Sequence, residues 1–300
     1  MRTLDSGAFM TSPNLSIDRP GRAIACMIGA MAFFALMDAQ AKLLGASLPV
    51  PELVFFRLIG GLLVVAPLYF RQPAPQRRLV NPGLLAVRAG LGLAGVALYF
   101  AALTTLGMAE VAAVSFAAPF LVTALGALAL HEPVSRRHWI ALLVGFAGML
   151  VILRPGGGVV SSGGLLALAG ALAYALLIIT LRIQGRVMTS ITSAFWFLAV
   201  APFVVLPLLP VVWVTPTWDQ APWLLGLGIA GGLGQILLTM ALRLAPASTV
   251  APFDYTYLVW ATGLGWFLFG DFPDRETLLG LPLVIGAGLV LLRRDRETGP

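Results

Sequence analysis

The stretch Gly29-Ala30-Met31-Ala32-Phe33 is echoed by Gly170-Ala171-Leu172-Ala173-Tyr174, at an offset of 141 residues. Phe55-Phe56 and Trp196-Phe197 repeat at the same offset, and later matches continue to residue 288 at offsets of 139 and 140 residues. Each half of the chain holds five hydrophobic spans. Because five is odd, a second half that crosses a bilayer five times runs upside down relative to the first.

The composition is that of a protein that lives in lipid. Hydrophobic residues make up 59% of the 300 residues and charged residues 11%, whereas soluble domains carry about 25% charge. The apolar stretches reach the length of about 20 residues that a membrane-spanning helix needs. Runs such as 141–153 do not alternate polar and apolar residues as a membrane barrel strand does. The sequence therefore predicts an all-α, polytopic membrane protein.

Ten transmembrane helices in two inverted five-helix repeats account for the apolar pattern. The predicted spans are 22–44, 51–70, 83–105, 109–130, 137–154, 163–184, 190–212, 220–243, 247–270 and 276–293. We divide the chain into a cytoplasmic tail, a first repeat, a glycine-rich linker, a second repeat and a short tail, at 1–21, 22–155, 156–164, 165–294 and 295–300.

The basic residues sort strongly between the two sides of this topology. Fifteen fall on the side of the termini and three on the other, while Arg57 lies inside a span. The fifteen are Arg2, Arg19, Arg22, Arg71, Arg77, Arg78, Arg88, Arg136, Arg137, Arg182, Arg186, Arg243, Arg293, Arg294 and Arg296. Positive charge is retained on the cytoplasmic side, so both termini are predicted to be cytoplasmic in a bacterial inner membrane. The net charge of +6 then reflects insertion and not nucleic-acid binding.

Three local patterns resemble the EamA family of the drug/metabolite transporter superfamily. They are Pro51-Glu52-Leu53-Val54-Phe55-Phe56-Arg57, Leu130-His131-Glu132-Pro133 and Leu143-Val144-Gly145-Phe146-Ala147-Gly148. The resemblance covers residues 22–294 and implies a metabolite transporter; within the family, aromatic amino-acid exporters of the YddG type are a plausible match. The second half departs from the pattern, because Asp271-Phe272-Pro273 carries one residue more than Glu132-Pro133.

Charged residues inside the first two spans are the first candidate site. A charge near the bilayer centre costs about 2.5–3.5 kcal/mol on insertion scales, so such residues face the bundle interior. Asp38 and Lys42 are four residues apart and can pair on one helix face. Alternatively, Asp38 binds and releases a proton in an exchange cycle. Arg57 is predicted either to pair with Glu52 or Glu110, or to clamp a substrate carboxylate.

The ninth span is the richest in polar and aromatic residues, from Ser248 to Trp260. Asp254 has no basic residue three or four positions away, and Pro252 is expected to bend the helix there. At an offset of 139 residues Asp254 corresponds to Ser115, close to Pro119 in the fourth span. Broken helices at equivalent positions of two repeats indicate a substrate region, although kinked packing explains the same pattern.

The predicted substrate cavity combines these positions with polar and aromatic residues of other spans, a lining that suits a small amphipathic ligand. It comprises Tyr99, Ser115, Pro119, Tyr174, Gln235, Thr239, Asp254, Tyr255, Tyr257 and Trp260. Each aromatic residue among them is alternatively a packing residue.

The predicted function is secondary transport of small organic metabolites by alternating access, with export of hydrophobic or aromatic amino acids favoured by the resemblance. Uptake or efflux of S-adenosylmethionine, a vitamin or a sugar, or proton-coupled efflux of cationic drugs, stays open. The sequence has no Walker A loop, no His/Cys cluster and no nucleophile elbow. We therefore expect no ATP, no metal, no other cofactor and no enzymatic activity; a monomer is compatible with this design.

Overall fold

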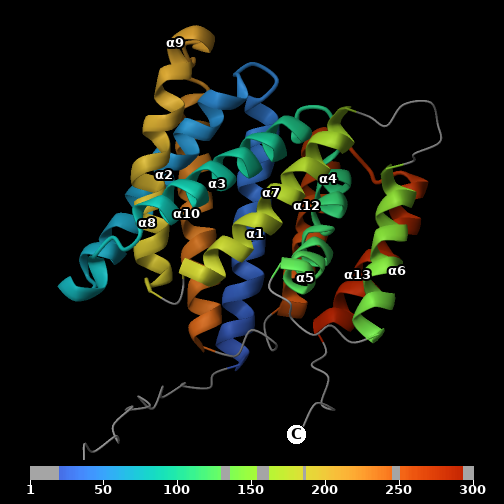
Figure 1. Cartoon of the computed structure of the whole chain (residues 1–300). Coiled ribbons are helices and arrows are strands. Elements are labelled where there is room, and N and C mark those ends of the chain that lie inside the picture. Colours follow the sequence, from blue (N-terminus) through green and yellow to red (C-terminus); the bar gives the residue numbers. More distant parts are fainter. Residues whose placement is uncertain (1–19, 130–135, 154–161, 185–186, 245–250, 293–300) are drawn as a thin grey trace, which may run out of the picture.

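The computed structural model describes residues 20–129, 136–153, 162–184, 187–244 and 251–292, and these residues form helices without any strand (Figure 1). The α-helices are α1 (Pro20–Leu44), α2 (Val50–Phe70), α3 (Pro82–Leu103), α4 (Met108–Ser115), α5 (Ala118–Ala129), α6 (Arg136–Leu153), α7 (Ser162–Gln184), α8 (Ser190–Val205), α9 (Leu209–Val212), α10 (Ala221–Leu244), α12 (Thr256–Phe269) and α13 (Arg275–Leu292). Short 3₁₀ helices are η1 (Ala74–Arg77), η2 (Leu206–Leu208) and η3 (Ala251–Tyr255).

Each of the ten predicted spans overlaps a helix or a pair of abutting helices, so the all-α prediction is confirmed. Within the described residues, six segments are both long and apolar enough to cross a membrane. They are α1, α2, α3, Ser162–Leu181 of α7, the run Ser190–Val212 through α8 and α9, and Ala221–Ala241 of α10.

Helix ends follow local sequence. Pro82 occupies the first turn of α3, where its missing N–H is not needed, and the side chain of Asn81 accepts a hydrogen bond from Leu84 N at 3.0 Å. At the other extreme, Gly270 closes α12 with a φ of +72°, a conformation that glycine adopts without a steric penalty. These stops produce the short connections that make neighbouring helices antiparallel.

Helix packing follows the internal repeat. The repeat relates α1 to α7 and α3 to α10, and the structure packs α1 along α10 and α3 along α7 (Figure 1). These two pairs are images of one another, while α6 with α13 and α2 with α8 are pairs that map onto themselves. An inverted repeat requires this pairing across a two-fold pseudo-axis. The core between the pairs is rich in small residues, including Ala30, Ala35 and Ala230, which let helices approach closely in lipid.

The fourth and ninth spans are broken at equivalent positions. The break between α4 and α5 falls at Phe116, and the change from η3 to α12 falls at Tyr255, which is Phe116 plus the 139-residue offset. Their rings stack at 4.8 Å with an interplanar angle of 18°. The continuous ninth span predicted for 247–270 is therefore wrong in part, because residues 251–255, with Pro252, form a 3₁₀ turn before α12 begins. Residues 245–250 lie outside the described residues.

Two ends of the bundle are distinguished below. The terminal end is where α1 begins and α13 ends, at the bottom of Figure 1. The Lys42 end is the opposite one, where α1 ends and α9 lies, at the top of Figure 1.

Candidate functional site

Asp38 joins residues from both halves of the chain. Its side chain is 3% exposed, and Oδ2 accepts hydrogen bonds from the hydroxyl of Tyr257 at 2.5 Å and of Tyr99 at 3.2 Å. The two hydroxyls also contact each other at 2.5 Å. Oδ1 is buried and has no hydrogen-bond partner among the described residues. The structure thus brings three predicted site residues, from α1, α3 and α12, into one closed triangle.

Arg57 lies beside this triangle without a bonded acid. Its only hydrogen bond in the described part of the chain runs from Nε to Met37 Sδ at 3.2 Å, and its guanidinium lies 5.9 Å from the centre of the Phe100 ring. The guanidinium is close enough to Asp38 for a direct electrostatic interaction. Arg57 therefore presents an uncommitted fork of donors near a buried carboxyl group.

The predicted pairing of Arg57 with Glu52 or Glu110 is wrong. Glu52 Oε2 accepts a hydrogen bond from Val214 N at 3.2 Å, and Glu110 Oε2 accepts one from Gly107 N at 3.4 Å at the start of α4. Both acids lie in the first turn of a helix, where backbone N–H groups need acceptors. Local backbone donors therefore take the carboxylates.

Lys42 does not pair with Asp38 either. Its Nζ forms a salt bridge with Asp271 Oδ2 at 2.6 Å, donates to Leu106 O at 2.7 Å and lies 5.2 Å from the centre of the Phe269 ring. The two tyrosine hydroxyls already satisfy Asp38 Oδ2, whereas the turn between α3 and α4 offers Lys42 a carbonyl oxygen. We call this contact of Lys42, Asp271 and Leu106 the Lys42 latch; it ties three connections together at the Lys42 end.

Asp254 belongs to a second, separate group. It lies in η3, where it interacts electrostatically with Tyr174 of α7 and with Tyr255, whose ring stacks on Phe116. Ser115, the repeat equivalent of Asp254, has a buried Oγ without a hydrogen-bond partner among the described residues. The structure thus gathers four predicted residues around the broken helices, with Pro119 at the second position of α5.

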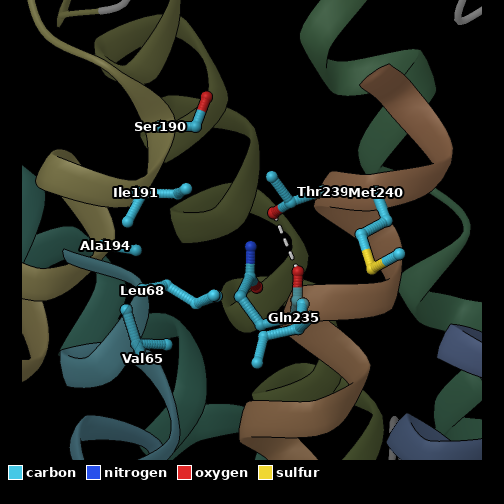
Figure 2. A pocket seen from close by; sticks show the side chains of 9 residues that line it. Val65, Leu68, Ser190, Ile191, Ala194, Gln235, Thr239 and Met240 are labelled. Carbon is cyan, nitrogen blue, oxygen red and sulfur yellow. Dashed lines mark hydrogen bonds between the residues drawn. The ribbon is translucent and has the colours of Figure 1, made fainter. Parts of the chain in front are cut away.

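Gln235 and Thr239 line a third region, a cavity of about 260 Å³ between α2, α8 and α10 near the terminal end. Figure 2 shows the amide of Gln235 pointing between the helices, while Thr239 Oγ1 donates to Gln235 O at 2.8 Å. The remaining lining residues are Val65, Leu68, Ser190, Ile191, Ala194, Ile236 and Met240. An apolar cavity with a few amide and hydroxyl groups suits a small organic molecule. Trp260, 41% exposed on α12, joins none of the three regions.

The opposite end is closed. In addition to the Lys42 latch, Glu52 holds the backbone of Val214, and the rings of Phe56 and Trp213 lie 6.3 Å apart. These contacts tie the start of α2 to the connection between α9 and α10. The structure is therefore sealed at the Lys42 end and hollow at the terminal end.

Sequence reasoning missed two charged residues with buried or long-range roles. Arg88, counted with the basic residues of the terminal side, is only 8% exposed; it donates to Ser193 O and lies 4.9 Å from the centre of the Phe197 ring. Its position six residues inside a predicted span was the available signal. Asp271 was visible only as an extra residue in the second repeat. No group of three or more His, Cys, Asp or Glu side chains that could hold a metal occurs in the described part of the chain.

Comparisons with known proteins agree on one family. The model described as the EamA-like transporter family matches residues 21–154 and 161–293. The pseudopaline exporter CntI of Pseudomonas aeruginosa is 32% identical over 267 residues, 88% of this chain and 93% of that protein. The S-adenosylmethionine uptake transporter of Rickettsia felis is 27% identical over 260 residues, 87% of this chain and 88% of that protein. A solved crystal structure with 19% identity has a TM-score of 0.62 over 90% of this chain and 96% of that one, which shows a common fold.

Proposed function

Because the chain belongs to the EamA-like transporter family, we propose that it exports small zwitterionic metabolites of the amino-acid class, with hydrophobic or aromatic side chains preferred. The family match confirms the resemblance found in the sequence. The relatives are metabolite transporters, so the chain is a multi-pass membrane transporter. The charge distribution supports a cytoplasmic terminal end in a bacterial inner membrane.

One observation carries the proposed substrate class: a buried acid and an uncommitted cation lie together among aromatic rings. Asp38 Oδ1 has no hydrogen-bond partner, and the terminal nitrogens of Arg57 make no hydrogen bond in the described residues. An α-ammonium group fits the first and an α-carboxylate fits the second. Buried polar atoms left unsatisfied cost about 1–3 kcal/mol each, so a zwitterion that supplies both partners gains affinity at this site.

The cavity between α2, α8 and α10 supports a path from the terminal end. Its volume of about 260 Å³ and its mostly apolar lining favour a small molecule with a hydrophobic side chain. Export is supported by the 32% identical relative, which is an exporter. Uptake is the rival, because the relative from Rickettsia felis is an uptake transporter.

Counterflow in proteoliposomes tests the proposal. Vesicles loaded with one unlabelled compound at a time are given a labelled aromatic amino acid outside; the panel holds amino acids, their decarboxylated amines, S-adenosylmethionine, a sugar and a vitamin. We expect amino acids to drive counterflow, and amines to do so at least about tenfold less, as the loss of one charged hydrogen-bonded contact predicts. Arg57→Gln is expected to abolish this discrimination and Arg57→Lys to retain part of it. Failure of every amino acid, with exchange of another class after its own label is used, would overturn the proposal.

A further inference from the structure

We infer that Asp38, Tyr99 and Tyr257 form a proton-binding site at which one proton and the ammonium group of the substrate compete, so that export is exchange for a proton. This inference rests on the proposed function. It assigns a second ligand, the proton, to residues that neither the family match nor the relatives describe.

The number of hydrogen atoms available in the triangle carries the argument. Three oxygens are in mutual contact, Asp38 Oδ2, Tyr99 Oη and Tyr257 Oη, at 2.5, 2.5 and 3.2 Å. Each contact needs one hydrogen, but two hydroxyls supply only two. With Asp38 ionised, one pair of oxygens would face each other with lone pairs alone. A proton on Asp38 Oδ2 completes a ring in which every group donates once and accepts once.

The surroundings of Asp38 show what replaces that proton. From α3 and α12 the titratable groups that face it are the two tyrosines, and from α2 the only cation is Arg57. Lys42, one turn further along α1, is held by Asp271. The helix α10, packed along α1, carries no ionisable residue before its last turn. In η3, Asp254 interacts with the tyrosines of the second group. Arg57 is thus the available counter-charge once Asp38 is ionised.

The free oxygen of Asp38 provides the place for competition. An ammonium group carries one positive charge and three donors, and it can bond to Oδ1, which has no partner, and to Oδ2 in place of the proton. Proton and ammonium each neutralise the same carboxylate, so a low-dielectric site favours one of them at a time. The proton that leaves goes to water on the side from which the substrate arrives.

The ring also spans the two halves of the chain. Tyr99 belongs to the first half and Tyr257 to the second, so a separation of α3 from α12 breaks their 2.5 Å contact. The third hydrogen is needed only while that contact is closed. Substrate entry between these helices and proton loss are therefore two consequences of the same opening. One zwitterion out for one proton in moves one positive charge inward per cycle.

Proton release on substrate binding tests the inference directly. Purified protein in weakly buffered detergent receives the amino acid that gives the strongest counterflow, and a pH indicator reports protons released per protein bound. We expect a release that approaches one proton in the pH range where the apparent Kd becomes about tenfold weaker per unit of falling pH. Tyr99→Phe and Tyr257→Phe are expected to reduce the release, because the remaining contacts need fewer hydrogens. Tyr69→Phe is the matched control: its hydroxyl donates to Arg77 O, outside the site, and the release should match the unmodified protein.

Transport measurements separate this inference from the proposed function. An inward proton gradient and an inside-negative potential should each drive concentrative transport by the unmodified protein. Substrate binding with no proton release, together with counterflow but no response to either gradient, would overturn the inference and leave the proposed function intact. Absence of counterflow by every amino acid would overturn the proposed function instead.

Discussion

The two ends of the bundle are related by the internal repeat but are filled differently. At the terminal end, Thr239 and Ala194 line the cavity of about 260 Å³. Their repeat equivalents at the Lys42 end are Phe100 and Leu53, which are 2% and 0% exposed. Larger side chains thus occupy, at one end, the space that is hollow at the other. The same backbone pattern is closed or open depending on side-chain volume.

Helix contacts differ in the same way. Gly60 of α2 and Gly228 of α10 touch through their backbones, so closely that a Cβ on Gly60 would lie 2.4 Å from Gly228 Cα. The equivalent residues between α8 and α3 are Ala201 and Ala89. Methyl groups hold those two helices further apart than two glycines would. In an alternating-access cycle, such a structure is the state closed at the Lys42 end.

The largest expected effect comes from making the hollow end resemble the closed one. Thr239→Phe places at the cavity the residue that its repeat equivalent, Phe100, has at the other end. The ring fills the cavity, so the initial rate of counterflow is expected to fall to background, a loss of at least about tenfold, whereas overpacking costs about 1–3 kcal/mol of stability. Thr239→Val is the matched control, because it removes the hydroxyl but keeps the volume. Full counterflow by a folded Thr239→Phe protein would contradict the role of this cavity.

The second expected effect concerns the glycine contact. Gly60→Ala forces α2 and α10 apart, since the added methyl group would overlap Gly228. Overpacking of this kind costs about 1–3 kcal/mol, which should appear as a lower midpoint of thermal unfolding in detergent. Gly263→Ala is the control, because nothing lies within 4 Å of a Cβ there. Equal destabilisation by both changes would indicate helix propensity and not the α2–α10 contact.

Much of the architecture was predictable because it is encoded locally. Hydrophobic span length and the offset repeat predicted the helices and their inverted pairing, since both depend on neighbouring residues in the sequence. Proline and the polar cluster predicted a break near Asp254, and the structure has a 3₁₀ turn there. The role of Phe116 was missed, because its stacking on Tyr255 depends on how two spans cross.

The partners of the charged residues were less predictable. Helical spacing suggested Asp38 with Lys42, but such a pair is worth only about 0.5 kcal/mol, and Lys42 instead binds Asp271, 229 positions away. Arg57 similarly bonds to Met37 Sδ and lies by Phe100. Long-range partners depend on the register between helices, which one sequence does not state. Counting Arg88 as a loop charge failed because a side chain near a span end can turn inward as well as snorkel.

The third expected effect concerns the Lys42 latch. Lys42 is the only lysine of the chain, so an amine-reactive reagent reports the latch with the terminal amine as its one competitor. Asp271→Asn removes a salt bridge whose side chains are 17% and 37% exposed, which is worth about 1 kcal/mol. Labelling of Lys42, measured by mass spectrometry of the peptide, should become about threefold to tenfold faster. Asp219→Asn, in the exposed connection before α10, is the control and should leave the rate unchanged. An unaltered rate in Asp271→Asn would show that other contacts close this end.

The smallest expected effect concerns Glu52, the other polar closure at the same end. Glu52→Gln keeps an oxygen that can accept from Val214 N but loses the negative charge, and charge-assisted hydrogen bonds are about twice as strong as neutral ones. The change therefore weakens the closure by less than about 1 kcal/mol, and labelling of Lys42 should rise by less than about threefold. Glu52→Leu removes the acceptor altogether and should exceed Glu52→Gln. If Glu52→Gln instead raised labelling more than Asp271→Asn, the connection before α10 would be the stronger closure, and the Lys42 latch would follow its movement.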